Sequence, residues 1–280
     1  MRQPIEIPRV EGLSDGEFRD RYLKANRPVV IAGGAADWPA AGWTPEVLRA
    51  KAGAAKVLTH RSGTVYFGLD EENGGPKFPE EEMTLDRFVS LALDPPEDGM
   101  RYYLQRASIP DRIPGLLDDL KMPAGLDPKK IYLLNLWFGP AANVTRLHYD
   151  VPNNFLVHFY GRKRLTMFAP GDTKRIYPFR SKAYNMSQVD IDLPDVERFP
   201  KFADAQPYQA EIGPGDMIYI PPFWWHQVYS LEMGISANYW WIPSVTQLFA
   251  PQLPDTFMDI TRALVQRVVH RPAAPGMAAG

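Results

Sequence analysis

The sequence has no cysteine among its 280 residues, which excludes disulfide bonds and thiolate metal ligands. It also lacks an excess of charge, because 31 Lys and Arg stand against 33 Asp and Glu, a net charge of -2. A protein that binds nucleic acid broadly needs a basic surface, so nucleic acid is disfavoured as a partner. Any bound metal must be held by His, Asp, Glu or backbone oxygen.

Long hydrophobic runs are missing as well. Nowhere do the roughly 18 uncharged apolar residues of a membrane-spanning helix follow one another, and Met1 to Ile7 contain no apolar leader segment. We therefore expect no membrane association and a cytoplasmic location. What the chain does have is 45% hydrophobic and 12% aromatic residues, enough for a sizeable core, and we expect residues 1–280 to form a single domain.

Residues 1–100 carry the signals of a mixed α/β region. Ser14 with Glu17 three residues later is a capping-box pattern, which predicts a short helix. Thr44 and Thr84 are further N-cap residues and predict two more helices. Runs rich in β-branched and aromatic residues predict strands at 28–31, 57–59 and 64–67.

Residues 101–242 consist of short β runs separated by Pro, Gly and Asn. Turns are expected at 160–163 and at 213–216, where Pro214 and Gly215 suit a type II turn. The expected strands are 101–105, 131–138, 145–149, 154–160, 164–168, 217–220, 227–230 and 235–241. This regular spacing is typical of a mainly β fold, and these runs fit a jelly roll, or double-stranded β-helix.

Residues 243–280 show one further pattern, an amphipathic helix from Asp255 to Val268. Its apolar stripe can cover the barrel or pair with a second copy of the chain, so a homodimer through this helix is one of two expected outcomes.

The chain has five histidines, and two of them stand in a pattern suited to metal binding. His148 and Asp150 are two residues apart on an expected strand, so both side chains point to the same face. His226 follows a Pro-Pro-Phe-Trp-Trp run far downstream and can supply a third ligand. Two His and one carboxylate are typical of non-haem Fe(II) oxygenases, which keep open positions on the metal. Zinc accepts the same ligands and stays open as an alternative.

These residues lie within a longer stretch that resembles a known family, the cupin-like JmjC oxygenases, and within it most closely the asparaginyl hydroxylases. The segments that carry the resemblance are Tyr102–Gln105, Gly139–Lys163, Gln188–Asp190, Glu197–Pro200 and Gly213–His226. The resemblance implies a jelly roll of the cupin/JmjC type and an enzyme that uses Fe(II), O₂ and the co-substrate 2-oxoglutarate, with His148, Asp150 and His226 as the iron ligands.

The resemblance also implies roles for other residues. Lys163 would pair with the distal carboxylate of 2-oxoglutarate, with Thr145 and Tyr103 donating hydrogen bonds to it. Asn154 and Asn238 would line the same pocket, and Gln105 and Trp240 would lie on the substrate side. Without the metal pattern beside it, Lys163 is better explained as a solvated lysine of a hairpin. Thr145 and Tyr103 can likewise be explained as residues of half-buried strands.

The resemblance implies hydroxylation of a protein side chain, so a protein or peptide is the expected partner. The alternatives are a JmjC-type N-demethylase, a hydroxylase of a small molecule or RNA base, and a non-catalytic cupin-like binding module. One departure bears on the substrate. Asparaginyl hydroxylases carry an Arg-Gln pair where this chain has Asn185 and Met186, so asparagine specificity is not carried over.

Overall fold

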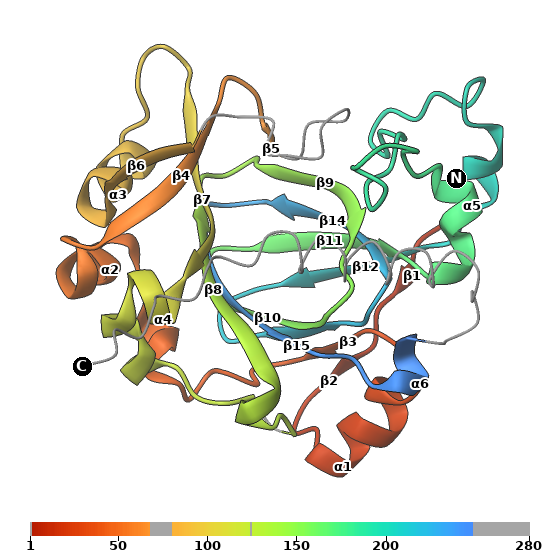
Figure 1. The fold of residues 1–280 in the computed structure, drawn as a ribbon, viewed down its shortest axis with the longest axis horizontal. Coiled ribbons are helices and arrows are strands. Elements are labelled where there is room, and N and C mark those ends of the chain that lie inside the picture. The colour runs from red at the N-terminus through yellow and green to blue at the C-terminus, as the bar shows by residue number, and fades with distance from the viewer. Residues whose placement is uncertain (1, 68–79, 124, 249–280) are drawn as a thin grey trace, which may run out of the picture.

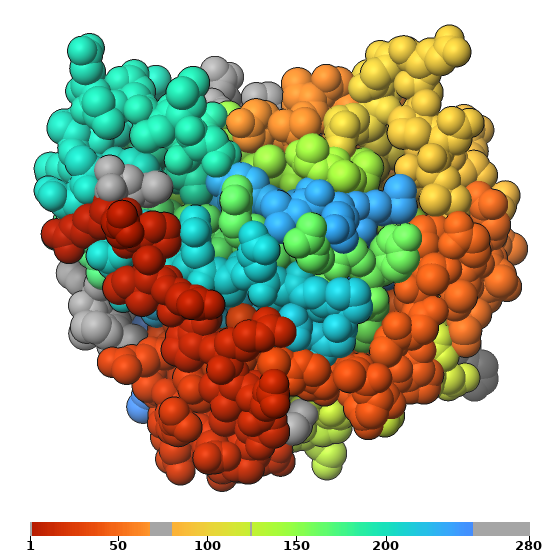
Figure 2. All heavy atoms as spheres, turned by 180° about the vertical axis from the view of Figure 1, so that it is seen from behind, coloured from red at the N-terminus to blue at the C-terminus, as the bar shows by residue number. Residues whose placement is uncertain are grey.

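The computed structural model describes residues 2–67, 80–123 and 125–248, and its main features are two β-sheets with short helices around them (Figure 1). The first sheet has six strands. In spatial order these are β1 (Ile5–Glu6), β12 (Pro207–Ile212), β11 (Lys163–Phe168), β14 (Trp225–Ser230), β9 (Val144–Tyr149) and β5 (Tyr66–Phe67). The N-terminal segment pairs with β12 at its edge, and the two lie together in the space-filling view (Figure 2).

The second sheet has nine strands. In spatial order these are β2 (Arg9–Val10), β3 (Val29–Ile31), β13 (Met217–Ile220), β10 (Asn153–Tyr160), β15 (Gly234–Trp241), β8 (Ile131–Gly139), β7 (Arg101–Ser108), β4 (Lys56–Ser62) and β6 (Glu80–Thr84). From β8 onward the chain passes repeatedly from one sheet to the other, as a jelly roll requires. The expected mainly β jelly-roll fold is confirmed.

The helices are short and lie outside the sheets. Ser14, Thr44 and Thr84 each accept a hydrogen bond from the backbone N–H three residues on, so the three predicted N-caps are present. The α-helices are α1 (Asp15–Glu17), α2 (Pro45–Ala52), α3 (Leu85–Leu93), α4 (Ile109–Arg112), α5 (Thr173–Ile176) and α6 (Val245–Leu248). The π-helix η1 (Phe18–Leu23) continues α1, and the 3₁₀ turns are η2 (Pro39–Gly42), η3 (Pro114–Asp119), η4 (Pro128–Lys130), η5 (Pro170–Asp172) and η6 (Pro200–Asp204). No helix in the described ranges is long and apolar enough to cross a bilayer.

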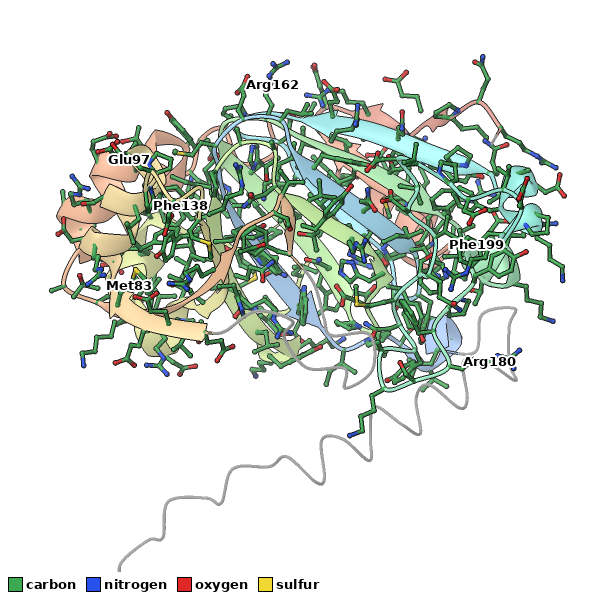
Figure 3. The ribbon with its side chains drawn as sticks, turned by 90° about the horizontal axis from the view of Figure 1, so that it is seen from above. Met83, Glu97, Phe138, Arg162, Arg180 and Phe199 are labelled. Carbon is green, nitrogen blue, oxygen red and sulfur yellow. The ribbon has the colours of Figure 1, made fainter. Side chains whose placement is uncertain are left out.

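The largest apolar cluster joins the helices to the nine-stranded sheet. Phe88 of α3 meets Phe138 of β8 edge to face, with ring centroids 5.0 Å apart. Figure 3 shows Phe138 inside this layer, whereas Arg162 and Arg180 lie at the periphery. Because this side of the sheet is filled, the other side is the one left for a pocket.

Both predicted turns occur. Gly161 and Gly215 have φ angles of 74° and 85°, the left-handed region that glycine enters without strain. A Cβ at Gly161 would lie 1.9 Å from the carbonyl oxygen of Met233, so the close approach of these backbones also requires glycine.

Several expectations need correction or lie outside the described residues. Strands β1, β2, β6 and β12 are additional to the predicted set. β1 and β2 have only two residues each, and the acidic run of β6 and the polar residues of β12 hide their β pairing. His226 lies within β14 rather than before it. The amphipathic helix predicted from Asp255 to Val268 lies outside the described residues, so the dimer through it stays a prediction, as does the single domain.

Candidate metal centre

His148, Asp150 and His226 come together although they are far apart in the sequence. Strands β9 and β14 pair antiparallel, and His148 and His226 are direct partners in that register. Asp150 follows β9, two residues after His148, as the alternation of the strand predicts. One ligand atom from each residue lies within 4.8 Å of the others, close enough to share one metal ion.

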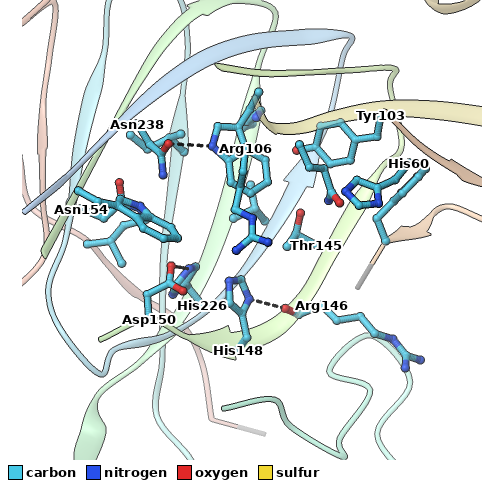
Figure 4. Close-up of a pocket in the computed structure, with 18 of the residues that line it drawn as sticks. His60, Tyr103, Arg106, Thr145, Arg146, His148, Asp150, Asn154, His226 and Asn238 are labelled. Atoms are coloured by element: carbon cyan, nitrogen blue, oxygen red, sulfur yellow. Dashed lines mark hydrogen bonds and ion pairs between the residues drawn. The ribbon is translucent and has the colours of Figure 1, made fainter. Parts of the chain in front are cut away.

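The backbone orients both imidazoles. Nδ1 of His148 lies 2.7 Å from the carbonyl oxygen of Arg146, and Nδ1 of His226 lies 2.9 Å from that of Trp224. If each Nδ1 donates its proton to that carbonyl, Nε2 is left with its lone pair for a metal. Nε2 of His226 lies 3.7 Å from Oδ2 of Asp150, and the side chains converge in the close-up (Figure 4).

The surroundings favour the neutral form of His226. Burial lowers the pKa of His226 to about 4, and the neighbouring imidazole of His148 acts in the same direction against the opposing effect of Asp150. Because metal ions bind the unprotonated ring, this shift prepares His226 as a ligand at neutral pH.

The triad lies in a pocket between the two sheets, with a volume of about 240 Å³. All ten predicted site residues line this pocket, and Figure 4 labels seven of them. They are Tyr103, Gln105, Thr145, His148, Asp150, Asn154, Lys163, His226, Asn238 and Trp240.

Lys163 is a buried cation that has no counter-charge in the described part of the chain. Its side chain is 2% exposed, so the solvated alternative is wrong. No carboxylate among the described residues forms an ion pair with it, and burial lowers the pKa of Lys163 to about 8. Nearby, Tyr103 and Thr145 share a hydrogen bond, and both belong to the lining of the pocket. An ammonium beside two hydroxyls fits a carboxylate ligand.

Other polar groups of the pocket also lack protein partners. Oδ1 of Asn154 and the indole N–H of Trp240 are buried and have no hydrogen-bond partner among the described residues. Asn238, in contrast, accepts a hydrogen bond of 2.9 Å from Nε1 of Trp137. Buried polar groups left open in this way fit a polar ligand such as a dicarboxylate.

Some lining residues were not predicted as site residues. They include Arg106, Trp137, His60 and Glu80, and no local pattern in the sequence marks any of them. The departure at Asn185 and Met186 also reaches the site, because both residues line the pocket and Met186 forms a β-bridge with His148.

The similar proteins include lysine-specific demethylases and tRNA wybutosine-synthesizing proteins. Lysine-specific demethylase 8 of Xenopus tropicalis is 32% identical over 241 residues, which cover 84% of this chain and 52% of that protein. Lysine-specific demethylase JMJ30 of Arabidopsis thaliana is 34% identical over 242 residues, covering 84% of this chain and 54% of that protein. The tRNA wybutosine-synthesizing protein 5 of Gallus gallus is 28% identical over 253 residues, covering 85% and 77%.

The chain thus spans about half the length of the demethylase relatives. None of these names indicates asparaginyl hydroxylation or a location in the cell. The particular resemblance to the asparaginyl hydroxylases and the cytoplasmic location therefore stay predictions.

The family model of a cupin-like domain matches residues 15–247. The JmjC oxygenases with this domain use Fe(II) and 2-oxoglutarate, and the group of His148, Asp150 and His226 fits an iron site. The match covers most of the chain, and the two sheets and the metal-binding triad are consistent with it. The chain therefore belongs to the cupin-like JmjC-domain family.

Proposed function

We propose that this chain is an Fe(II)- and 2-oxoglutarate-dependent oxygenase that hydroxylates a protein side chain. One observation carries the proposal: the three possible metal ligands line the same pocket as the buried ammonium of Lys163, which has no counter-charge among the described residues. A buried charge without a partner lowers the stability of the fold, so its retention favours an anionic ligand bound beside the metal ligands.

The lining residues include a group that would bind the metal and a group that would bind 2-oxoglutarate. His148, Asp150 and His226 would hold Fe(II), and all three side chains line the pocket. Lys163 binds the distal carboxylate of 2-oxoglutarate through a charge-assisted hydrogen bond, and the hydroxyls of Thr145 and Tyr103 donate to the same carboxylate.

When bound, Fe(II) and 2-oxoglutarate supply oxidation by O₂. One oxygen atom converts a C–H group of the substrate into C–OH, and the other enters succinate as 2-oxoglutarate loses CO₂. The chain keeps water from the reacting atoms with apolar groups of the lining, including Trp137, Leu156 and Ile220. Asn154 and Asn238 orient the co-substrate, and Gln105 and Trp240 face the substrate.

A second candidate reaction is removal of an N-methyl group. The names of the relatives that are 32% and 34% identical favour it, because both are lysine-specific demethylases. The two reactions share the oxidation step and differ in the carbon that is oxidised. Hydroxylation of an N-methyl carbon gives an N-hydroxymethyl group, whose C–N bond breaks to release formaldehyde while the hydroxyl proton passes to the nitrogen. A hydroxyl on another carbon stays on the product.

The test is turnover of 2-oxoglutarate by purified protein with Fe(II), ascorbate and O₂. We expect succinate from the wild type and none from Asp150→Ala. The matched control is Asp204→Ala, which removes an exposed carboxylate of η6 outside the pocket and should keep the wild-type rate. Absence of succinate from the wild type, with and without added protein substrates, would favour the binding module.

The reaction type is then decided by mass spectrometry of host proteins treated with active enzyme or with Asp150→Ala. A gain of one oxygen supports hydroxylation. Loss of a methyl group with formaldehyde release supports demethylation instead.

A further inference from the structure

Arg106 is a charged residue of the pocket for which the proposed reaction has no role. It is exposed at the mouth, and its side chain runs into the pocket toward His148 (Figure 4). Within the described ranges its guanidinium makes no hydrogen bond or ion pair.

A β-bulge directs Arg106 into the pocket. Leu104 pairs with Phe138 and Ala107 with Leu136, so three steps along β7 match two steps along β8. Arg106 lies in this bulge with a φ of 50°, in the left-handed region that non-glycine residues rarely adopt. Strict alternation after Tyr103 would send Arg106 to the side of the sheet where Leu104 is buried.

The bulge therefore places the Arg106 side chain in the pocket, whereas a regular strand would direct it to the opposite side of the sheet. Backbone strain of this kind persists where the surrounding structure holds it in place, and it concentrates at functional sites.

The other charged groups at the mouth have interactions of their own. Glu80 lies 3.9 Å from Nε2 of His60, and the guanidinium of Arg146 lies over the ring of Tyr66, 5.0 Å from its centroid. Figure 4 shows the Arg146 side chain directed away from the triad.

Deeper in the pocket, the two charges of 2-oxoglutarate and that of Asp150 balance Fe(II) and Lys163. Among the described lining residues, this leaves the positive charge of Arg106 without a counter-charge. A guanidinium binds a carboxylate through two parallel hydrogen bonds.

We propose that Arg106 binds the carboxylate of the residue that is oxidised, and that the substrate is a protein segment presenting an Asp or Glu side chain to the metal. This inference rests on the proposed function and names its substrate class. It disfavours methylated lysine, because that cation would face a second fixed cation at the mouth of the pocket.

The test measures binding, which does not require turnover. Immobilised protein loaded with Mn(II) and 2-oxoglutarate is exposed to peptide pools with random flanks and a fixed central Asp, Asn, Lys or trimethyl-lysine. We expect the wild type to retain the Asp pool at least on the order of tenfold more than the Asn pool, the lower end of what a charge-assisted contact contributes.

Three substitutions of Arg106 separate its charge from its shape. Arg106→Gln should bring the Asp to Asn ratio to about one, whereas Arg106→Lys should keep part of the preference, because its ammonium lacks the bidentate geometry. Arg106→Glu should shift retention to the Lys pool. The control is Arg112→Gln, which changes the net charge equally at an exposed arginine 3.8 Å from Glu82 and outside the pocket lining.

Equal retention of the Asp and Asn pools by the wild type, including no retention of either, overturns the inference. So does an unchanged ratio in Arg106→Gln, or a preference of the wild type for trimethyl-lysine. Because the ratio compares two pools on one protein, it does not depend on catalytic activity. Failure of the proposed function would show instead as absence of succinate.

Discussion

Replacing Lys163 with methionine should make the protein more stable and abolish most of its affinity for 2-oxoglutarate. Burial lowers the pKa of Lys163 from 10.5 to about 8. At 1.36 kcal/mol per pKa unit, that difference of roughly 2.5 corresponds to about 3 kcal/mol of lost stability at neutral pH. Methionine fills a similar volume without the charge, so the ligand-free Lys163→Met protein should gain up to this amount.

The pH dependence has a definite sign. A lysine whose pKa is depressed by folding binds its proton more tightly in the unfolded chain, so the wild type bears the full penalty below about pH 8. The penalty disappears as the pH rises from about 8 to 10.5. The difference in melting temperature between Lys163→Met and wild type should therefore be largest near pH 7 and shrink above pH 8.

The affinity for 2-oxoglutarate should fall in Lys163→Met although the stability of the fold rises. A hydrogen bond to a charged group contributes about 1.5 to 3 kcal/mol, so Lys163→Met should bind 2-oxoglutarate roughly 10- to 150-fold more weakly. Thermal melts with increasing 2-oxoglutarate, at a fixed concentration of Mn(II), measure both effects. The control is Lys201→Met, because Lys201 is exposed and should change neither quantity. A Lys163→Met protein that is less stable at pH 7, or that 2-oxoglutarate stabilises as much as wild type, would refute the reasoning.

Three further predictions test the metal, the co-substrate end and the N-terminal cap. Mn(II) should raise the melting temperature of the wild type but not of Asp150→Ala, and a chelator should reverse the rise. Gly234→Ala places a Cβ 3.2 Å from Cε of Lys163, so steady-state kinetics should show KM for 2-oxoglutarate rising more than kcat falls. Ser14→Ala removes the capping box with Glu17 and should cost about 1 kcal/mol in urea unfolding, with succinate formation unchanged.

Local patterns in the sequence determined much of this structure. The caps at Ser14, Thr44 and Thr84 and the turns at Gly161 and Gly215 each depend on a few neighbouring residues, and all of them occur as predicted. The spacing of His148 and Asp150 likewise predicted two side chains on one face, because alternation along a strand is a local property.

Tertiary structure decided what depends on distant parts of the chain. The sequence could not set the register that places His226 opposite His148, since a shift of one residue would turn either ring to the other face. It could not show that Lys163 is buried with no counter-charge among the residues that the structure describes, because that depends on every element packed around it. The direction of Arg106 comes from a bulge in the pairing of β7 with β8, and no single strand encodes its own pairing irregularities.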